Sequence, residues 1–300
     1  MWEISDYLFA DSPPEAVSLM RQGPGKGIYL AGGTDLLLNP PECDFVVDIS
    51  RAGISNIART PGGDVFLGAG VTLQDLATNE LVTSFAGGEL SRVASQCGNR
   101  PVRNLATIGG NLCNARSSAD TAPILLALDA TCFITDQDSQ ESLPLDDFFV
   151  GPQQTILENR LLVGLALSAE VSDRRCASSK LICRADNMAL AHVAVGVDCR
   201  EGRINAARIA LGAVAPIPLR ATLAESTLDG FDINSEDKET LSEMICDVAE
   251  LAAGEVDPID EHRASSEYRR DLVRVLTRRL LEKVLAEIAA ESALNDGGQS

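Results

Sequence analysis

Two glycine-rich segments contain the residues whose types and spacing could do chemistry. They are residues 29–38 (YLAGGTDLLL) and 107–120 (TIGGNLCNARSSAD), and each places paired glycines between an apolar run and a segment that could begin a helix. Glycine lets backbone N–H groups approach a ligand closely, and successive N–H groups beside a helix N-terminus form a concave anion site. One such loop is weak evidence. Two of them, about 75 residues apart, predict a ligand with two phosphates or one long ligand that crosses both loops.

The net charge limits which ligands and partners the chain can hold. The sequence has 25 Lys and Arg against 44 Asp and Glu, a formal net charge of −19 at pH 7. This charge argues against nucleic acid and anionic membranes as partners. Because few cations are available, phosphates would have to be held by backbone amides and helix ends, which two glycine loops can supply. We interpret most of the carboxylates as a solubilising surface.

Membrane and metal-binding signals are absent from the sequence. No run of 18 or more apolar residues predicts a transmembrane helix, and the acidic N-terminal segment does not resemble a signal peptide, so we expect a cytoplasmic protein. None of the eight cysteines forms a C-x-x-C pair, so neither a zinc site nor a ferredoxin-type cluster is predicted. Scattered cysteines in a cytosolic chain are usually small buried hydrophobes.

Short helices and strands are expected around the two glycine loops. Ser12 and Glu15 form a predicted capping box for a helix that ends near Gly23, and Thr72 caps a second helix that runs to about Asn79. The other predicted elements of this half are strands at 27–31, 45–49, 65–70, 131–135 and 158–166 and helices at 89–95 and 122–128.

A polar stretch at 171–177 is interpreted as a domain boundary. Beyond it, segments 188–198 and 203–214 predict two strands joined by a turn at 200–202. His192 is interpreted as a half-buried side chain, since no Ser, Cys or carboxylate set accompanies it. Two closing helices are predicted at 236–253 and 265–290. The second carries a basic run, which is either a solvated face or a docking surface for a partner: Arg269, Arg270, Arg274, Arg278 and Arg279.

Both loops resemble those of a known flavoprotein family. AGGTDL at 31–36, TIGGN at 107–111 and Asp120 are similar to the two FAD-holding loops of the flavin-binding subunit of the molybdenum hydroxylases, the family of xanthine dehydrogenase, aerobic carbon monoxide dehydrogenase and nicotinate dehydrogenase. The resemblance covers nearly the whole chain. It continues through the segments NRPVRN, DFFVGP, GAVAPIPLR and RASSEYRR.

The resemblance implies an α+β fold with two domains. The first, residues 1–172, would be a two-lobed FAD-binding domain of the vanillyl-alcohol-oxidase/PCMH type, with lobes at about 1–55 and 56–172. The second, residues 176–292, would be a C-terminal flavoprotein domain of the carbon monoxide dehydrogenase medium-subunit type. In that domain we expect a three-stranded antiparallel sheet and a helical layer. The tail at 293–300 is predicted to be disordered.

The resemblance also implies a set of cofactor-binding residues, but no catalytic residue and no metal ligand. The set comprises Tyr29, Leu30, Ala31, Gly32, Gly33, Thr34, Asp35, Leu36, Thr107, Gly110, Asn111, Asn114, Asp120, Leu162 and Lys180.

Several of these residues have a second interpretation from the sequence alone. Asp35 could be a turn residue. Asp120 could be a carboxylate at a helix N-terminus instead of a ribose ligand. Lys180 could be a solvated surface lysine or a cation at the N1–C2 edge of the flavin, where it would stabilise the negative charge of the reduced ring. Arg103 could neutralise a phosphate or bond loop carbonyls. Arg116 is left outside the core site.

In function, the chain looks like an FAD-carrying electron-transfer subunit. By resemblance, a large subunit with a molybdenum cofactor hydroxylates the substrate, and a small subunit with [2Fe-2S] clusters relays electrons to FAD, in a dimer of heterotrimers. The acceptor could be NAD⁺, a quinone, oxygen or a ferredoxin. One alternative is a stand-alone FAD-dependent oxidoreductase of the wider PCMH fold, and another is a scaffold that has lost the cofactor.

Overall fold

The computed structural model describes residues 4–182, 188–234 and 237–297. Cys183 and residue 236, where a helix is predicted to begin, lie outside these ranges. The chain forms two compact units that are not contiguous in sequence. Unit 1 comprises Met1–Thr83, Leu90–Ala115 and Asp129–Ala169, and unit 2 comprises Ser84–Glu89, Arg116–Leu128 and Glu170–Ser300.

The first part of unit 1 is a three-stranded parallel sheet in the order β1-β3-β2. Its strands are β1 (Asp6–Phe9), β2 (Gly27–Leu30) and β3 (Phe45–Asp48), and helix α1 spans Pro13–Gln22. Ser12 caps α1 as predicted, by accepting a hydrogen bond from the Glu15 N–H. Glu15 itself accepts from the Asp11 N–H at 2.8 Å, one residue before the Ser12 N–H that a capping box would use.

The second part of unit 1 is a five-stranded antiparallel sheet in the order β4-β5-β10-β6-β7. Apolar strands in the middle of the sheet form the core, and β10 is buried along almost its whole length. The strands are β4 (Ile57–Arg59), β5 (Val65–Gly68), β6 (Thr131–Thr135), β7 (Gln140–Pro144) and β10 (Leu161–Leu167), with a separate hairpin of β8 (Phe149–Gly151) and β9 (Gln154–Thr155).

Short helices connect these strands. Thr72 caps the start of α2 as predicted, and Asn79, near the predicted end, is its C-cap. The helices before the unit 2 sheet are α2 (Leu73–Thr78), α3 (Glu80–Thr83), α4 (Glu89–Ser95), α5 (Arg100–Arg103), α6 (Ile108–Cys113) and α7 (Ala122–Ala127), with 3₁₀ turns η1 (Phe85–Gly88), η2 (Leu145–Asp147) and η3 (Ala169–Val171).

Unit 2 is built on an antiparallel sheet in the order β11-β12-β13-β14. Its strands are β11 (Arg175–Leu181), β12 (Ala191–Arg200), β13 (Arg203–Gly212) and β14 (Leu219–Arg220). The first three strands match the expected three-stranded sheet, and the two-residue β14 adds an edge. The predicted turn between β12 and β13 consists of Glu201 and Gly202, both with positive φ.

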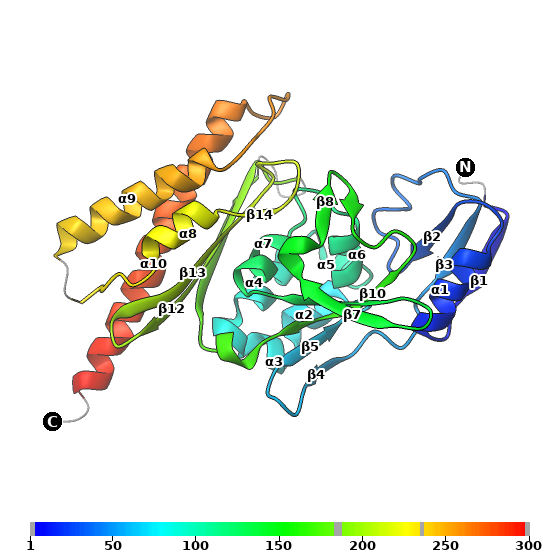
Figure 1. Cartoon of the computed structure of the whole chain (residues 1–300). Coiled ribbons are helices and arrows are strands. Elements are labelled where there is room, and N and C mark those ends of the chain that lie inside the picture. The colour runs from blue at the N-terminus through cyan, green and yellow to red at the C-terminus, as the bar shows by residue number, and fades with distance from the viewer. Residues whose placement is uncertain (1–3, 183–187, 235–236, 298–300) are drawn as a thin grey trace. The chain divides into compact units, whose positions relative to one another are not determined.

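Helices α8 (Thr222–Leu228) and α10 (Ser266–Gly297) pack against strands of this sheet, and α9 (Lys238–Gly254) packs against both of these helices. Figure 1 shows α8 and α10 between α9 and the strands. Helix α10 continues past the predicted end at residue 290 into the segment expected to be disordered, since no glycine or proline interrupts it before Gly297.

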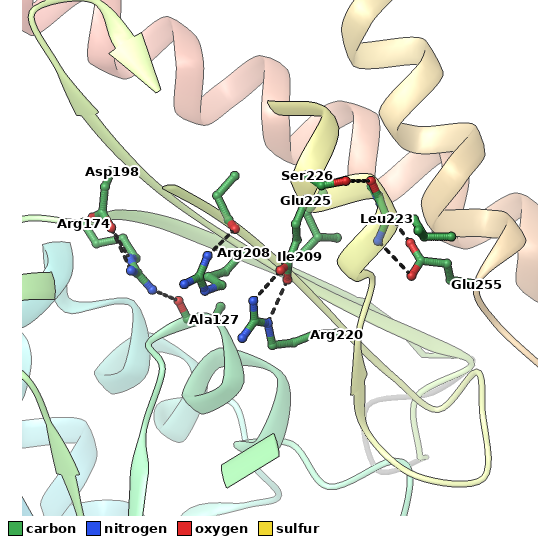
Figure 2. Close-up of polar contacts among 12 residues, drawn as sticks. Ala127, Arg174, Asp198, Arg208, Ile209, Arg220, Leu223, Glu225, Ser226 and Glu255 are labelled. Carbon is green, nitrogen blue, oxygen red and sulfur yellow. Dashed lines mark hydrogen bonds and ion pairs between the residues drawn. The ribbon is translucent and has the colours of Figure 1, made fainter. Parts of the chain in front are cut away.

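Buried ion pairs connect helices and strands of unit 2. Arg174, 3% exposed, donates to Asp198 at 2.7 Å and to the Ala127 carbonyl at the end of α7 (Figure 2). In the same figure, Glu225 accepts from Arg220 and from the Ile209 N–H at 2.9 Å.

The arginine run on α10 is not one solvated face. Arg269 is 3% exposed and donates to the Leu190 and Ala213 carbonyls. Arg274 pairs with Glu250 and Asp271, and Arg278 pairs with Glu282 at 3.7 Å. Much of the positive charge of the run is therefore neutralised within the chain.

Candidate functional site

The first glycine turn follows strand β2 directly. Gly33 has φ +67°, a conformation that favours glycine, and its carbonyl accepts from the Leu37 N–H at 2.9 Å. The Asn39 N–H bonds the Asp35 carbonyl, so the chain completes only one turn. The segment after the first glycines, which could have begun a helix, forms a turn instead, and Asp35 is a turn residue, one of its two predicted roles. Pro40 and Pro41 follow at once and lack the N–H groups that a longer helix would need.

The second glycine turn forms the start of α6, with Thr107 as its N-cap. Its first amides are already bonded within the chain. The Ile108 N–H donates to the Val71 carbonyl at 2.9 Å, and the Gly109 N–H donates to the Ala69 carbonyl at 2.8 Å. The Gly110 N–H donates to the Thr107 hydroxyl at 3.0 Å. The prediction that both turns offer backbone amides to an anion is therefore wrong for these three amides of the second turn.

The first turn touches the residues that lead directly into the second turn. A Cβ added to Gly32 would lie 2.5 Å from the Leu105 carbonyl carbon, closer still to its oxygen, and 3.1 Å from the Ala106 nitrogen. Only glycine allows backbone segments to come this close. Among the described residues, the N–H groups of Gly32, Gly33 and Thr34 have no hydrogen-bond acceptor. The first turn thus has three adjacent donors available beside the second turn, an arrangement that fits a phosphate group.

Arg103 fixes the segment that leads into the second turn. Its guanidinium donates to the Gln74 side chain at 3.2 Å and to the carbonyls of Cys97 and Gly98. Of the two predicted roles for Arg103, bonding of loop carbonyls is the one the structure shows. Neither Gln74 nor Leu105 was expected at the site, and no local pattern distinguishes them, because their partners are remote in the sequence.

Two side chains of the predicted site in unit 1 are held by contacts within the protein. The Tyr29 hydroxyl donates to the Asn159 carbonyl at 3.1 Å, and burial raises the pKa of this phenol. The Leu162 side chain on β10 is 1% exposed. Any contact that Leu162 makes with a ligand would have to use its backbone.

The remaining predicted side chains of unit 1 lie at the second turn. Thr107 is buried and its hydroxyl caps α6, whereas Asn111 and Asn114 are half-buried at the middle and end of this helix. Amide side chains can donate to and accept from phosphate and sugar oxygens.

Asp120 and Lys180 belong to unit 2, where they form an ion pair. The Lys180 ammonium donates to Asp120 Oδ1 at 2.8 Å, with side chains 16% and 25% exposed, respectively. Lys180 is therefore not a freely solvated lysine. Asp120 precedes Thr121, the N-cap of α7, and so lies outside the first turn of that helix. Arg116 extends toward Met188, with 4.0 Å between its nitrogen and the sulfur.

The burial of His192 and of the cysteines agrees only in part with the predictions. His192 is 3% exposed, more buried than expected. Cys97 and Cys132 are buried as expected, whereas Cys113 and Cys246 are exposed. No group of three His, Cys, Asp or Glu side chains among the described residues could hold a metal ion. None of the helices that the structure describes has the length and apolar character to span a bilayer.

Comparisons with known proteins identify the family of this chain. Residues 3–167 match the family model described as the FAD binding domain in molybdopterin dehydrogenase. Residues 162–284 match the CO dehydrogenase flavoprotein C-terminal domain.

Similar proteins cover more than nine-tenths of the chain. The glyceraldehyde dehydrogenase medium chain of Sulfolobus acidocaldarius is 29% identical, over 93% of this chain and 97% of its own length. The xanthine dehydrogenase FAD-binding subunit of Escherichia coli O157:H7 is 27% identical, over 95% and 98%.

Among solved structures, a chain of the carbon monoxide dehydrogenase from Hydrogenophaga pseudoflava has a TM-score of 0.88 at 27% identity, covering 95% of this chain and 99% of its own. The first family model alone spans more than half of the sequence. The chain therefore belongs to the FAD-binding medium subunits of the molybdopterin dehydrogenases, a family of oxidoreductases.

Proposed function

We propose that this chain binds FAD, accepts electrons from a separate [2Fe-2S] subunit and passes them to an external acceptor. Two observations support this most directly: Gly32 packs against the backbone of Leu105 and Ala106, just before the second turn, and the adjacent amides of Gly32, Gly33 and Thr34 have no acceptor among the described residues. With such amides, an acidic protein can bind a diphosphate without using Lys or Arg side chains. Bound FAD supplies the redox chemistry, and the protein supplies binding, orientation and charge.

The residues have separate roles in this proposal. The amides of the first turn, residues 31–36, hold the diphosphate, and Asn111 and Asn114 bond phosphate or sugar oxygens. Thr107 contributes by fixing the start of α6. Asp120 and Lys180, which the resemblance assigns to the ribose side and to the ring edge, complete the set. Tyr29, Leu30 and Leu162 would contribute through their backbones, since the side chains of Tyr29 and Leu162 are held by protein.

The proposed domains follow the resemblance. The FAD-binding domain spans residues 1–172, with lobes at about 1–55 and 56–172, and the C-terminal domain spans 176–292. The relatives described as medium chains support a multi-subunit assembly. We therefore propose a large molybdenum-cofactor subunit and a small iron–sulfur subunit as partners, in a dimer of heterotrimers. The acceptor is NAD⁺, a quinone, oxygen or a ferredoxin.

An absorbance spectrum and a flavin titration test the proposal. The purified full-length chain should bind one FAD and show the two visible bands of an oxidised flavin. It should bind FMN, which lacks the diphosphate and adenosine, at least tenfold more weakly. A colourless chain that takes up no FAD would refute the proposal. Turnover of a small reductant with oxygen by the isolated chain would instead favour the stand-alone oxidoreductase.

A further inference from the structure

The ion pair of Asp120 and Lys180 connects two rigid parts of unit 2. Lys180 is the penultimate residue of β11, and its backbone position is fixed by pairing with His192 on β12. The Lys180 side chain is only 16% exposed, so its ammonium depends on Asp120 for part of its solvation.

Asp120 is held from the opposite side by α7. All six residues of this helix are buried, and a Cβ added to Gly212 at the end of β13 would lie 2.9 Å from Pro123. The Ala213 N–H donates to the Ser117 carbonyl at 2.7 Å, which ties the segment before α7 to the same strand. The carboxylate and the ammonium therefore meet because their backbones are fixed independently, which makes the pair preorganised.

This geometry gives Asp120 a partner within the protein. The resemblance assigns its carboxylate to ribose hydroxyls, yet its Oδ1 accepts from Lys180 without any ligand. We infer that Asp120 is a positioning residue, which fixes the protonated amine of Lys180, and that the pair acts as a unit on FAD affinity and on the reduction potential of bound flavin. This inference rests on the proposed FAD binding. Asp120 is then the residue that holds Lys180, the cation expected at the edge of the flavin ring.

A double-mutant cycle tests this role. FAD affinity is measured by flavin fluorescence for the full-length wild type, Asp120→Asn, Lys180→Met and the double variant, and the midpoint potential of each complex is measured by dye-coupled titration. Asp120→Asn should weaken FAD binding about tenfold when Lys180 is present, and less than about twofold in the Lys180→Met background. Lys180→Met should lower the midpoint potential, because it removes a positive charge that favours the reduced flavin.

A matched control breaks another ion pair of the same strand. Glu291→Gln removes the partner of Arg175, also on β11, and should change neither FAD affinity nor potential. If Asp120→Asn weakens FAD binding equally in both Lys180 backgrounds, the carboxylate contacts FAD itself and the positioning role is wrong.

A measurement without FAD separates this inference from the proposed function. The rate at which an activated acetyl ester modifies Lys180 is followed by mass spectrometry at pH 8. Loss of the carboxylate releases the Lys180 amine from its ion pair and leaves it more accessible to the reagent, so Asp120→Asn should raise this rate at least about threefold. An unchanged rate would overturn the pairing. Failure of the wild type to bind FAD would overturn the proposed function, and the acetylation rate would then decide the pairing alone.

Discussion

Substitution of Gly32 by alanine should push the first glycine turn away from the residues that lead into the second turn. The new Cβ would lie 2.5 Å from the Leu105 carbonyl carbon, whereas carbon atoms in ordinary contact are about 3.5–4.0 Å apart. One of the two backbone segments must therefore move by roughly 1 Å or more. No flexible side chain can move aside to relieve the clash, because the atoms of Leu105 and Ala106 that the Cβ would meet belong to the main chain.

The size of the effect follows from the cost of overpacking, about 1–3 kcal/mol. If the two segments separate to relieve the clash, FAD has to restore their contact, and its affinity should fall by about 5- to 150-fold. Urea unfolding, measured alongside flavin titration, reports how much of the clash is instead carried as lost stability.

Gly53→Ala is a suitable control for this experiment. Gly53 also lies in unit 1 and has φ +72°, yet an added Cβ would meet no atom within 4 Å. It should cost about 1 kcal/mol of stability through backbone strain and leave FAD affinity unchanged. A Gly32→Ala variant that binds FAD as tightly as the wild type, without loss of stability, would show that the close approach of Gly32 to Leu105 is not required.

Three further predictions concern stability. Thr277 on α10 is fully buried and its hydroxyl has no hydrogen-bond partner among the described residues, so Thr277→Val should stabilise the chain by about 1 kcal/mol in urea unfolding. Asp198→Asn removes the carboxylate that pairs with the buried Arg174 and should lower the free energy of unfolding by about 2 kcal/mol in the same assay. This loss is smaller than for a fully buried pair because the Asp198 side chain is 23% exposed. A loss near zero would contradict the pairing. Burial raises the pKa of the Cys132 thiol from 9.0 to about 12, with a further rise from Cys113, so this thiol ionises at a lower pH in the unfolded chain than in the folded one. The free energy of unfolding should therefore be constant below about pH 8 and fall as the pH rises from 9 toward 12. Cys132→Ala should make that fall less steep.

Local patterns predicted much of the fold. The caps at Ser12 and Thr72 and the turn at Glu201 and Gly202 were read correctly because each depends on residues within three positions of one another. The prolines at 40 and 41 also carried enough information to exclude a helix after the first turn.

The parts of the site that were not predicted depend on long-range contacts. The amides of Ile108 and Gly109 look available in the sequence, and only the fold brings the carbonyls of Val71 and Ala69 to them. Lys180 reaches Asp120 across 60 positions of the chain, with no local signature for the pair. The resemblance assigned both residues to the cofactor but contained no information about their mutual contact.

Amide hydrogen exchange of the full-length chain, with and without FAD, tests most directly whether the first turn's amides hold the diphosphate. The amides of Gly32, Gly33 and Thr34 should exchange rapidly without FAD, and the segment 31–36 should gain strong protection at saturating FAD. Residues 108–110, whose amides are bonded within the chain, should be protected under both conditions. Exchange at 31–36 that FAD leaves unchanged, or new protection confined to 108–110, would contradict this account.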